Sequence, residues 1–134
     1  MKSYEKGAIG EHRVVADLIS KGYRVHKPLS ESLPYDLVVS IRGLFFKIQV
    51  KYVTQRRGFI ETSPRSIKSR KNRIVNVDFD LLAIFCPDTQ ECYYVWRNEF
   101  EGSIRLRMKP TKNNQGKGVH LAKDYTDIKF NEKQ

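Results

Sequence analysis

The chain has 134 residues and a net charge of +10, with 40% hydrophobic and 30% charged residues. This length and composition predict one globular domain over residues 1–134 and argue against a disordered or fibrous protein. The apolar runs are shorter than the roughly 18 residues of a membrane-spanning helix, and the first residues lack the apolar segment of a signal peptide, so we expect a cytoplasmic protein.

The first predicted element is a helix over residues 4–21, with Gly22 as its stop signal. Apolar residues recur at helical spacing: Ala8, Val14, Val15, Leu18 and Ile19. Glu11 falls inside this apolar stripe, where a carboxylate is costly unless a cation meets it. Gly7 and Gly10 indicate either a close approach to another element or a frayed first turn.

Alternating sequences after the helix predict strands. Residues 23–27 form a short first strand, and residues 29–33 form a loop. Residues 35–41 and 44–53 form two strands of a hairpin, joined by a turn at residues 42–43. A sheet therefore begins directly after the helix.

The hairpin brings polar side chains together. Lys47, Gln49 and Lys51 share one face of the strand 44–53, while apolar side chains share the other. With the turn centred on residues 42–43, antiparallel pairing sets Asp36 opposite Gln49 and diagonal to Lys51. We therefore expect Asp36, Gln49 and Lys51 to lie close together.

The middle of the chain continues the α/β pattern. Residues 59–62 extend the sheet or form an edge piece. Ser63 as N-cap and Pro64 at the first helical position predict a short basic helix that ends near Asn72. The apolar residues 80–86 predict a central strand.

The last third predicts a return strand over residues 91–96, one or two helical turns over residues 97–102, and a strand over residues 104–108. Cys86 and Cys92 match neither a zinc array nor a CxxC pair, so we expect reduced core thiols. Three residues of the tail are candidate packing contacts: Tyr125, Ile128 and Phe130.

The positive charge is concentrated in two segments. Residues 56–73 carry seven lysines and arginines against one acid, and residues 104–123 carry six against none. This distribution favours a nucleic-acid partner, with an acidic protein or a membrane surface as alternatives. Arginines suit guanine edges and lysines suit phosphates. The candidate DNA contacts are Arg56, Arg57, Arg65, Lys68, Arg70, Lys71, Arg105, Arg107, Lys109, Lys112 and Lys117.

The polar residues of the hairpin and helix suit metal-assisted chemistry. The two carboxylates and the amide oxygen of Glu11, Asp36 and Gln49 are ligands that a hard cation such as Mg²⁺ prefers. Such a cation can activate water and stabilise charge on a phosphodiester, and Lys51 can orient that water or neutralise the transition state. The structural alternative is an ordinary amphipathic hairpin with solvated Lys47, Gln49 and Lys51.

In chain order, Glu11, Pro34-Tyr35-Asp36 and Gln49-Val50-Lys51 resemble the PD-(D/E)XK nuclease superfamily over roughly residues 4–96. The resemblance implies an α/β fold with a restriction-endonuclease-like core, a mixed β-sheet flanked by helices, and a basic C-terminal strand and loop extension over residues 97–134. It also implies Asp36 and Glu11 as ligands of Mg²⁺ or Mn²⁺, and Lys51 as the catalytic lysine.

This sequence departs from the family pattern at two positions. Tyr35 separates the proline from Asp36, and Gln49 stands where the family has an acid. The first departure is minor because only the aspartate carries chemistry. The second removes one negative charge, so a second metal should bind more weakly and Glu11 should become more necessary.

Within the superfamily, the chain looks most like homing endonucleases encoded by group I introns, particularly those of cyanobacterial transfer-RNA introns. That resemblance implies cleavage of a specific double-stranded DNA site by a homo-oligomer, a dimer or a tetramer built as a dimer of dimers. The alternatives are a Holliday-junction resolvase of the same superfamily and a catalytically silent DNA-binding module. We expect surface or packing roles for His12, His26 and His120.

Overall fold

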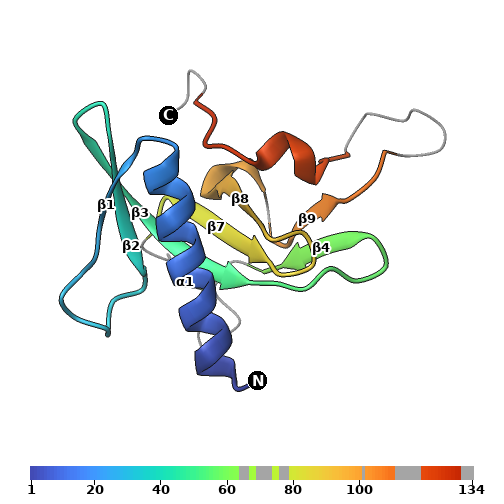
Figure 1. Ribbon diagram of the computed structural model, residues 1–134, viewed down its shortest axis with the longest axis horizontal. Coiled ribbons are helices and arrows are strands. Elements are labelled where there is room, and N and C mark those ends of the chain that lie inside the picture. The colour runs from blue at the N-terminus through green and yellow to red at the C-terminus, as the bar shows by residue number, and fades with distance from the viewer. Residues whose placement is uncertain (64–66, 69–73, 76–78, 101, 111–118, 131–134) are drawn as a thin grey trace.

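The computed structural model describes residues 1–63, 67–68, 74–75, 79–100, 102–110 and 119–130 (Figure 1). In chain order their elements are α1 (Ser3–Ser20), β1 (Arg24–His26), β2 (Leu37–Ile41), β3 (Leu44–Tyr52), β4 (Phe59–Thr62), β5 (Ile67–Lys68), β6 (Ile74–Val75), β7 (Leu81–Cys86), β8 (Glu91–Trp96), the 3-10 helix η1 (Arg97–Glu99), β9 (Ile104–Arg107) and the 3-10 helix η2 (Ala122–Tyr125). None of the helices in these ranges is long and apolar enough to cross a membrane.

The central sheet has five strands in the order β1-β2-β3-β7-β8. Its neighbouring strands are antiparallel except β3 and β7, which run parallel. The predicted hairpin of β2 and β3 is confirmed. Its turn residues Arg42 and Gly43 have φ angles of 53° and 81°, a left-handed pair that matches the twist of the two strands. β7, predicted as a central strand, is buried along its whole length.

The helix α1 covers one face of this sheet (Figure 1). Val14 and Leu18 are fully buried in the same apolar cluster as Ile48 of β3. Removal of these side chains from water is the main force that holds the helix on the sheet. Ala8 and Ile19, predicted on the same stripe, are instead exposed, because a helix on a flat sheet buries only the side chains that face it.

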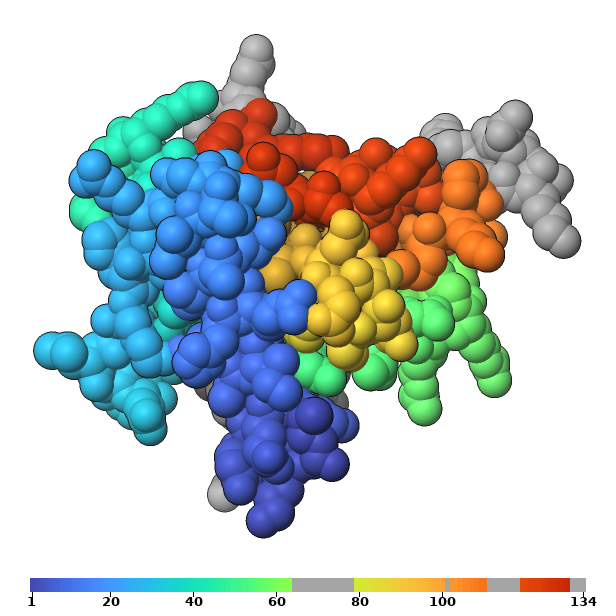
Figure 2. All heavy atoms as spheres, in the orientation of Figure 1, coloured from blue at the N-terminus to red at the C-terminus, as the bar shows by residue number. Residues whose placement is uncertain are grey.

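Polar contacts also fix the helix relative to the strands. Figure 2 shows α1 beside the β7–β8 turn, where Arg13 donates hydrogen bonds to the side-chain and backbone oxygens of Gln90 at 2.7 and 3.0 Å. Farther along the helix, the Tyr94 hydroxyl of β8 donates to the Asp17 carboxylate at 2.5 Å. These two attachments, in addition to the apolar contacts, set the position of the helix along the sheet.

The opposite face of the sheet is covered by the two-stranded sheet of β4 and β9 together with η2. Ile60 of β4 and Leu106 of β9 are fully buried in a second cluster with Leu82 and Ile84 of β7. The C-terminal strand therefore pairs with a strand from the middle of the chain and contributes to the main body of the fold. The sequence left open whether residues 59–62 extend the main sheet or form an edge piece. In the structure they form β4, which pairs with β9 in a separate two-stranded sheet.

The helix predicted after Ser63 is wrong where the structure describes that segment. Ile67–Lys68 form a short strand that pairs antiparallel with Ile74–Val75. Three of these four residues are β-branched, which favours extended backbone over helix when a partner strand is present. Pro64 and Asn72, the other residues of that prediction, lie outside the described residues.

The two cysteines are buried free thiols, as predicted. Cys92 belongs to the cluster under α1 and Cys86 to the cluster under the β4–β9 sheet. Because they lie on opposite faces of the central sheet, they pack as small apolar side chains in separate cores.

Candidate active site

The candidate site lies where β2 separates from β3. Their last pair is Leu37 with Ile48, and the same register continued by one residue sets Asp36 opposite Gln49, as the sequence predicts. The Asp36 amide still donates to the Ile48 carbonyl at 2.8 Å, but the Val50 amide donates to the Asp36 carboxylate at 2.7 Å. A side chain thus takes the place of a backbone acceptor, and the two strands part beyond it.

The strand β3 continues past this point with a different partner. It pairs in parallel with β7 as far as Tyr52 opposite Phe85. Gln49 and Lys51 therefore lie on a strand that is fixed on one side and open on the other. They flank Val50, whose backbone holds Asp36, so the hairpin brings the three predicted polar residues together.

Gln49 is a buried polar residue, with 3% of its surface exposed. Its amide nitrogen donates to the Pro34 carbonyl at 3.3 Å. This bond orients the amide, because the nitrogen is directed to the chain just before Asp36. The amide oxygen is then the end of the side chain that can serve as a ligand for a cation.

Glu11 reaches the same region from the helix. A Cβ atom on Gly10 would lie 3.5 Å from Tyr52 Cβ and 3.6 Å from Val50 Cγ1, so the helix backbone approaches β3 closely here. Of the two alternatives for the glycines, the structure shows the close approach at Gly10, whereas a Cβ atom on Gly7 would have no neighbour within 4 Å. The approach places half-buried Glu11 beside the open end of the hairpin.

Glu11 and Asp36 line one cavity of about 180 Å³. The other lining residues come from the loop between β1 and β2 and its flanks: Lys27, Pro28, Ser30, Glu31 and Tyr35. The two predicted carboxylates thus share a small polar cavity, although they are far apart in the sequence. Lys51 and Gln49 lie outside its lining but adjoin Asp36 through Val50.

Lys27 forms an ion pair with Glu11. This is the cation that the carboxylate on the apolar stripe was expected to need. The sequence did not identify Lys27 as that partner. Lys27 directly follows β1, which packs against α1, and this position was a possible signal. The loop after Lys27, however, has no strand register from which its contact with Glu11 could be predicted.

The residues fit a metal site of limited charge. In the part of the chain that the structure describes, no three Asp, Glu, His or Cys side chains form a group that could hold a metal ion. A divalent cation at this cavity would therefore use Glu11, Asp36 and neutral ligands such as the Gln49 amide oxygen and water. Mg²⁺ commonly keeps several waters and needs only one or two protein carboxylates, so this set is sufficient.

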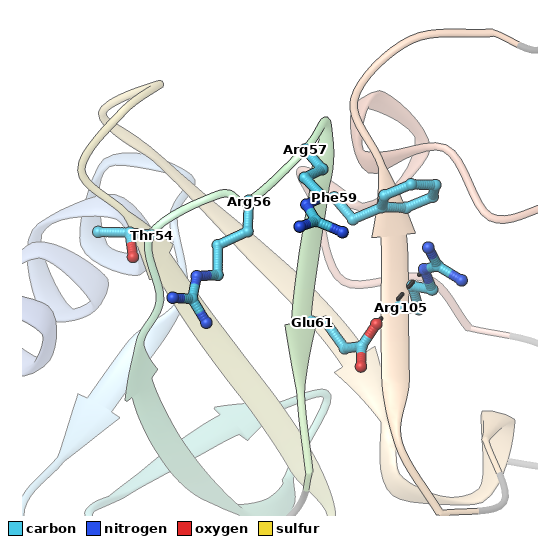
Figure 3. A pocket seen from close by; sticks show the side chains of 6 residues that line it. All are labelled: Thr54, Arg56, Arg57, Phe59, Glu61 and Arg105. Atoms are coloured by element: carbon cyan, nitrogen blue, oxygen red, sulfur yellow. Dashed lines mark ion pairs between the residues drawn. The ribbon is translucent and has the colours of Figure 1, made fainter.

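A second, basic pocket lies on the outer side of the β4–β9 sheet and has a volume of about 670 Å³ (Figure 3). Three predicted DNA contacts line this pocket: Arg56, Arg57 and Arg105. The other lining residues are Thr54, Phe59 and Glu61. Arg107 lines an adjoining pocket that shares Phe59 and Arg105. Positive charge from the two basic segments therefore meets on one surface.

The other predicted DNA contacts are placed less completely. Lys109 is exposed just after β9, and Lys68 lies in β5. The remaining five lie outside the described residues: Arg65, Arg70, Lys71, Lys112 and Lys117. The three histidines have roles in packing or on the surface; His120, for example, bonds to the Tyr125 hydroxyl at 2.7 Å and lies against the Phe100 ring.

Comparison with known proteins identifies the fold and the family of the chain. Among solved structures, the fold is similar to that of a bacterial homing endonuclease, I-Ssp6803I, with a TM-score of 0.62 and 22% identity over 83% of this chain and 79% of that one. A search of curated proteins gave no match. The sequence matches the family described as PD-(D/E)XK endonuclease over residues 1–128. Because that match spans nearly the whole chain, the protein belongs to the PD-(D/E)XK endonuclease family.

Proposed function

We propose that this protein is an Mg²⁺-dependent endonuclease that cuts specific sites in double-stranded DNA, with Glu11, Asp36, Gln49 and Lys51 as its active site. The observation that carries the proposal is that Glu11 and Asp36 line one cavity and that Asp36 is bonded to the Val50 amide, which lies between Gln49 and Lys51 on β3. The four residues come from three parts of the chain: α1, the end of the β1–β2 loop, and β3. Metal-assisted phosphodiester hydrolysis uses this combination of groups.

Each side chain has a separate task in this proposal. The carboxylates of Glu11 and Asp36 and the amide oxygen of Gln49 hold Mg²⁺ or Mn²⁺. The bound ion supplies a Lewis acid that acidifies water and neutralises charge on the phosphate. The Val50 amide keeps Asp36 in one orientation, which reduces the reorganisation needed when the ion binds. Lys51 presents a positive charge to the phosphate as negative charge grows on it.

Gln49 makes the site less negative than one with three acids. Two carboxylates balance the charge of one divalent ion, so little negative charge remains to attract a second ion. We therefore propose a site that works with one tightly held metal. Glu11 then supplies half of the ligand charge, so Glu11→Gln should be more damaging here than the loss of one acid from a set of three.

The proposal extends to a homing role in the cytoplasm, as a group I intron-encoded enzyme. Two features support it: the fold is similar to that of a bacterial homing endonuclease, and arginines from both basic segments line adjoining pockets. A homo-oligomer, either a dimer or a dimer of dimers, would present this surface in symmetric copies along a pseudo-palindromic site.

The proposal is tested by cleavage of a randomised library of linear duplexes in Mg²⁺, with a four-way junction offered in parallel. We expect recovery of cut duplexes that share one long sequence, and no cutting in EDTA. Preferential cutting of the junction without regard to sequence would instead identify a resolvase. Binding of duplexes without cutting in Mg²⁺ or Mn²⁺ would identify a silent DNA-binding module.

A further inference from the structure

The β4–β9 sheet has one buried and one exposed face. Ile60 and Leu106 are fully buried in the core, so strand alternation places Phe59 and Glu61 of β4 on the outer face. The register pairs Phe59 with Arg107 and Glu61 with Arg105, so two arginines stand directly opposite them. An aromatic ring, an acid and two arginines thus form the outer face of a two-stranded ribbon.

Arg105 is held on this face by two contacts of different kinds. The centre of its guanidinium lies 3.7 Å from the centre of the Phe59 ring, and its Nε lies 3.3 Å from Glu61 Oε2. Figure 3 shows these three side chains together at the edge of the pocket. The ring restricts the plane of the guanidinium, and the carboxylate restricts its rotation within that plane.

These restraints are unsuitable for a phosphate contact and suitable for a base contact. The neighbouring Glu61 offsets the charge of Arg105, which weakens its attraction to phosphates. Because the ion pair with Glu61 is made through Nε, the two terminal nitrogens are the donors suited to a planar, two-point contact with a partner. Such a fork matches the O6 and N7 acceptors of guanine in the major groove.

The scaffold and its surroundings fit the same target. A two-stranded antiparallel ribbon can enter the major groove of B-DNA, which is roughly 12 Å wide. Arg56 and Arg57 line the pocket next to Arg105 and can meet the phosphates that border the groove. The arrangement therefore sets the restrained Arg105 beside two further exposed arginines, Arg56 and Arg57.

We propose that Phe59 and Glu61 are positioning residues that hold Arg105 to read a guanine in the major groove. This inference rests on the proposed function, because it assumes a DNA substrate. In this proposal the β4–β9 ribbon recognises the base sequence of the DNA. The proposal also explains why an acid, Glu61, lies among the arginines of this surface. Glu61 acts through Arg105 and contributes to specificity more than to affinity.

The test is selection of bound duplexes from a randomised library in EDTA, so that base preference is measured without cleavage. The variants are Arg105→Lys, Glu61→Ala, Glu61→Gln and Phe59→Leu. Arg42→Lys is the control, because Arg42 is another exposed arginine near an aromatic ring, 5.5 Å from the centre of Phe130, and its replacement also preserves the charge.

Arg105→Lys should lower the preference for guanine at one position of each half-site by about tenfold or more, with nonspecific affinity and its salt dependence unchanged. Glu61→Ala and Phe59→Leu should weaken the preference at that same position. Glu61→Gln, which keeps an acceptor oxygen, should restore most of it, and Arg42→Lys should change nothing. Both charged side chains are more than half exposed, so melting temperatures should stay close to wild type.

The inference is overturned if Arg105→Lys leaves the base preference unchanged at every position, because lysine can replace arginine at a phosphate but not in a planar two-point contact with guanine. It is also overturned if Glu61→Ala alters a different base position from Arg105→Lys. Wild-type base preference without any cutting in Mg²⁺ would contradict the proposed nuclease function while leaving this reading of the ribbon intact.

Discussion

The Val50 backbone amide donates a hydrogen bond to the carboxylate of Asp36 at 2.7 Å, at the point where β2 leaves β3. The bond fixes a proposed metal ligand and also satisfies a backbone donor that the departing strand no longer meets. The Asp36 side chain therefore contributes both to the stability of the fold and to the proposed metal site. Substitutions that keep or remove its acceptor oxygen can separate these two contributions.

Asp36→Ala should lower the free energy of unfolding by about 1–2 kcal/mol, because it leaves the partly buried Val50 amide without its acceptor. Asp36→Asn keeps an acceptor oxygen and should cost less, yet both variants should lose metal-dependent cleavage. Urea denaturation in EDTA and cleavage in Mg²⁺ measure the two effects. Asp80→Ala is the matched control, since Asp80 accepts from the Lys47 amide at 2.8 Å outside the cavity. It should lose stability but retain cleavage.

Lys27→Met should raise the affinity for Mn²⁺ about three- to tenfold, because it removes the cation that competes for Glu11. The Lys27 side chain is 61% exposed, so little stability should be lost. Calorimetric titration of the DNA-free protein measures the affinity. Lys21→Met removes an equal charge from an ion pair with Asp17 in the same helix and should leave the affinity unchanged. Weaker metal binding by Lys27→Met would show that Lys27 supports the site instead of competing for it.

Gly10→Leu should disturb cleavage more than Gly7→Leu. Even a Cβ at residue 10 would be in van der Waals contact with Tyr52 and Val50, so the rest of a leucine must push the helix away from β3. Glu11 would move with it. Residue 7 has open space, and leucine there should be tolerated or slightly stabilising. Equal cleavage rates for the two variants would contradict the link between the close approach and the position of Glu11.

Stability should fall in alkaline solution, with Cys92 as one cause. Burial, with a smaller effect from the Asp17 charge, raises the pKa of the Cys92 thiol to about 11. Since an unfolded thiol has a pKa of roughly 8.5, the folded state favours the neutral form; its stabilisation is complete below that value and is lost as the pH rises toward 11. Burial also raises the pKa of Tyr94, which acts in the same direction.

The measurement is urea denaturation at several pH values between 7 and 11. Cys92→Ala should flatten the decline above pH 9, although its smaller side chain lowers stability at every pH. Cys86→Ala, at a buried thiol on the opposite face, controls for that loss of packing. An unchanged pH slope in Cys92→Ala would exclude the thiol as a cause.

The local parts of the site could be predicted from the sequence. Arg42-Gly43 defines a two-residue turn, and a turn fixes the register of its strands, so the position of Asp36 opposite Gln49 followed from the spacing alone. A close approach was also one of the two alternatives for Gly7 and Gly10, and the structure shows it at Gly10. Both inferences needed only the geometry of one element or one hairpin.

The non-local parts could not be predicted. The pairing of β4 with β9 joins distant segments, and alternation in each strand does not identify its partner. The ion pair of Lys27 with Glu11 depends on how a loop returns to the helix. The capping signals at Ser63-Pro64 favoured a helix, but pairing between Ile67–Lys68 and Ile74–Val75 decided the structure.

The most direct test of the active site is the effect of Lys51→Ala on single-turnover DNA cleavage and on DNA affinity. Lys47→Ala is the control, because Lys47 shares the same strand and face and its replacement removes the same charge. We predict that Lys51→Ala lowers the cleavage rate by at least about 100-fold while DNA affinity changes by no more than a few-fold, because the lysine acts in the transition state. Lys47→Ala should keep most of the cleavage rate. Cleavage by Lys51→Ala in Mg²⁺ at close to the wild-type rate would contradict the proposed active site.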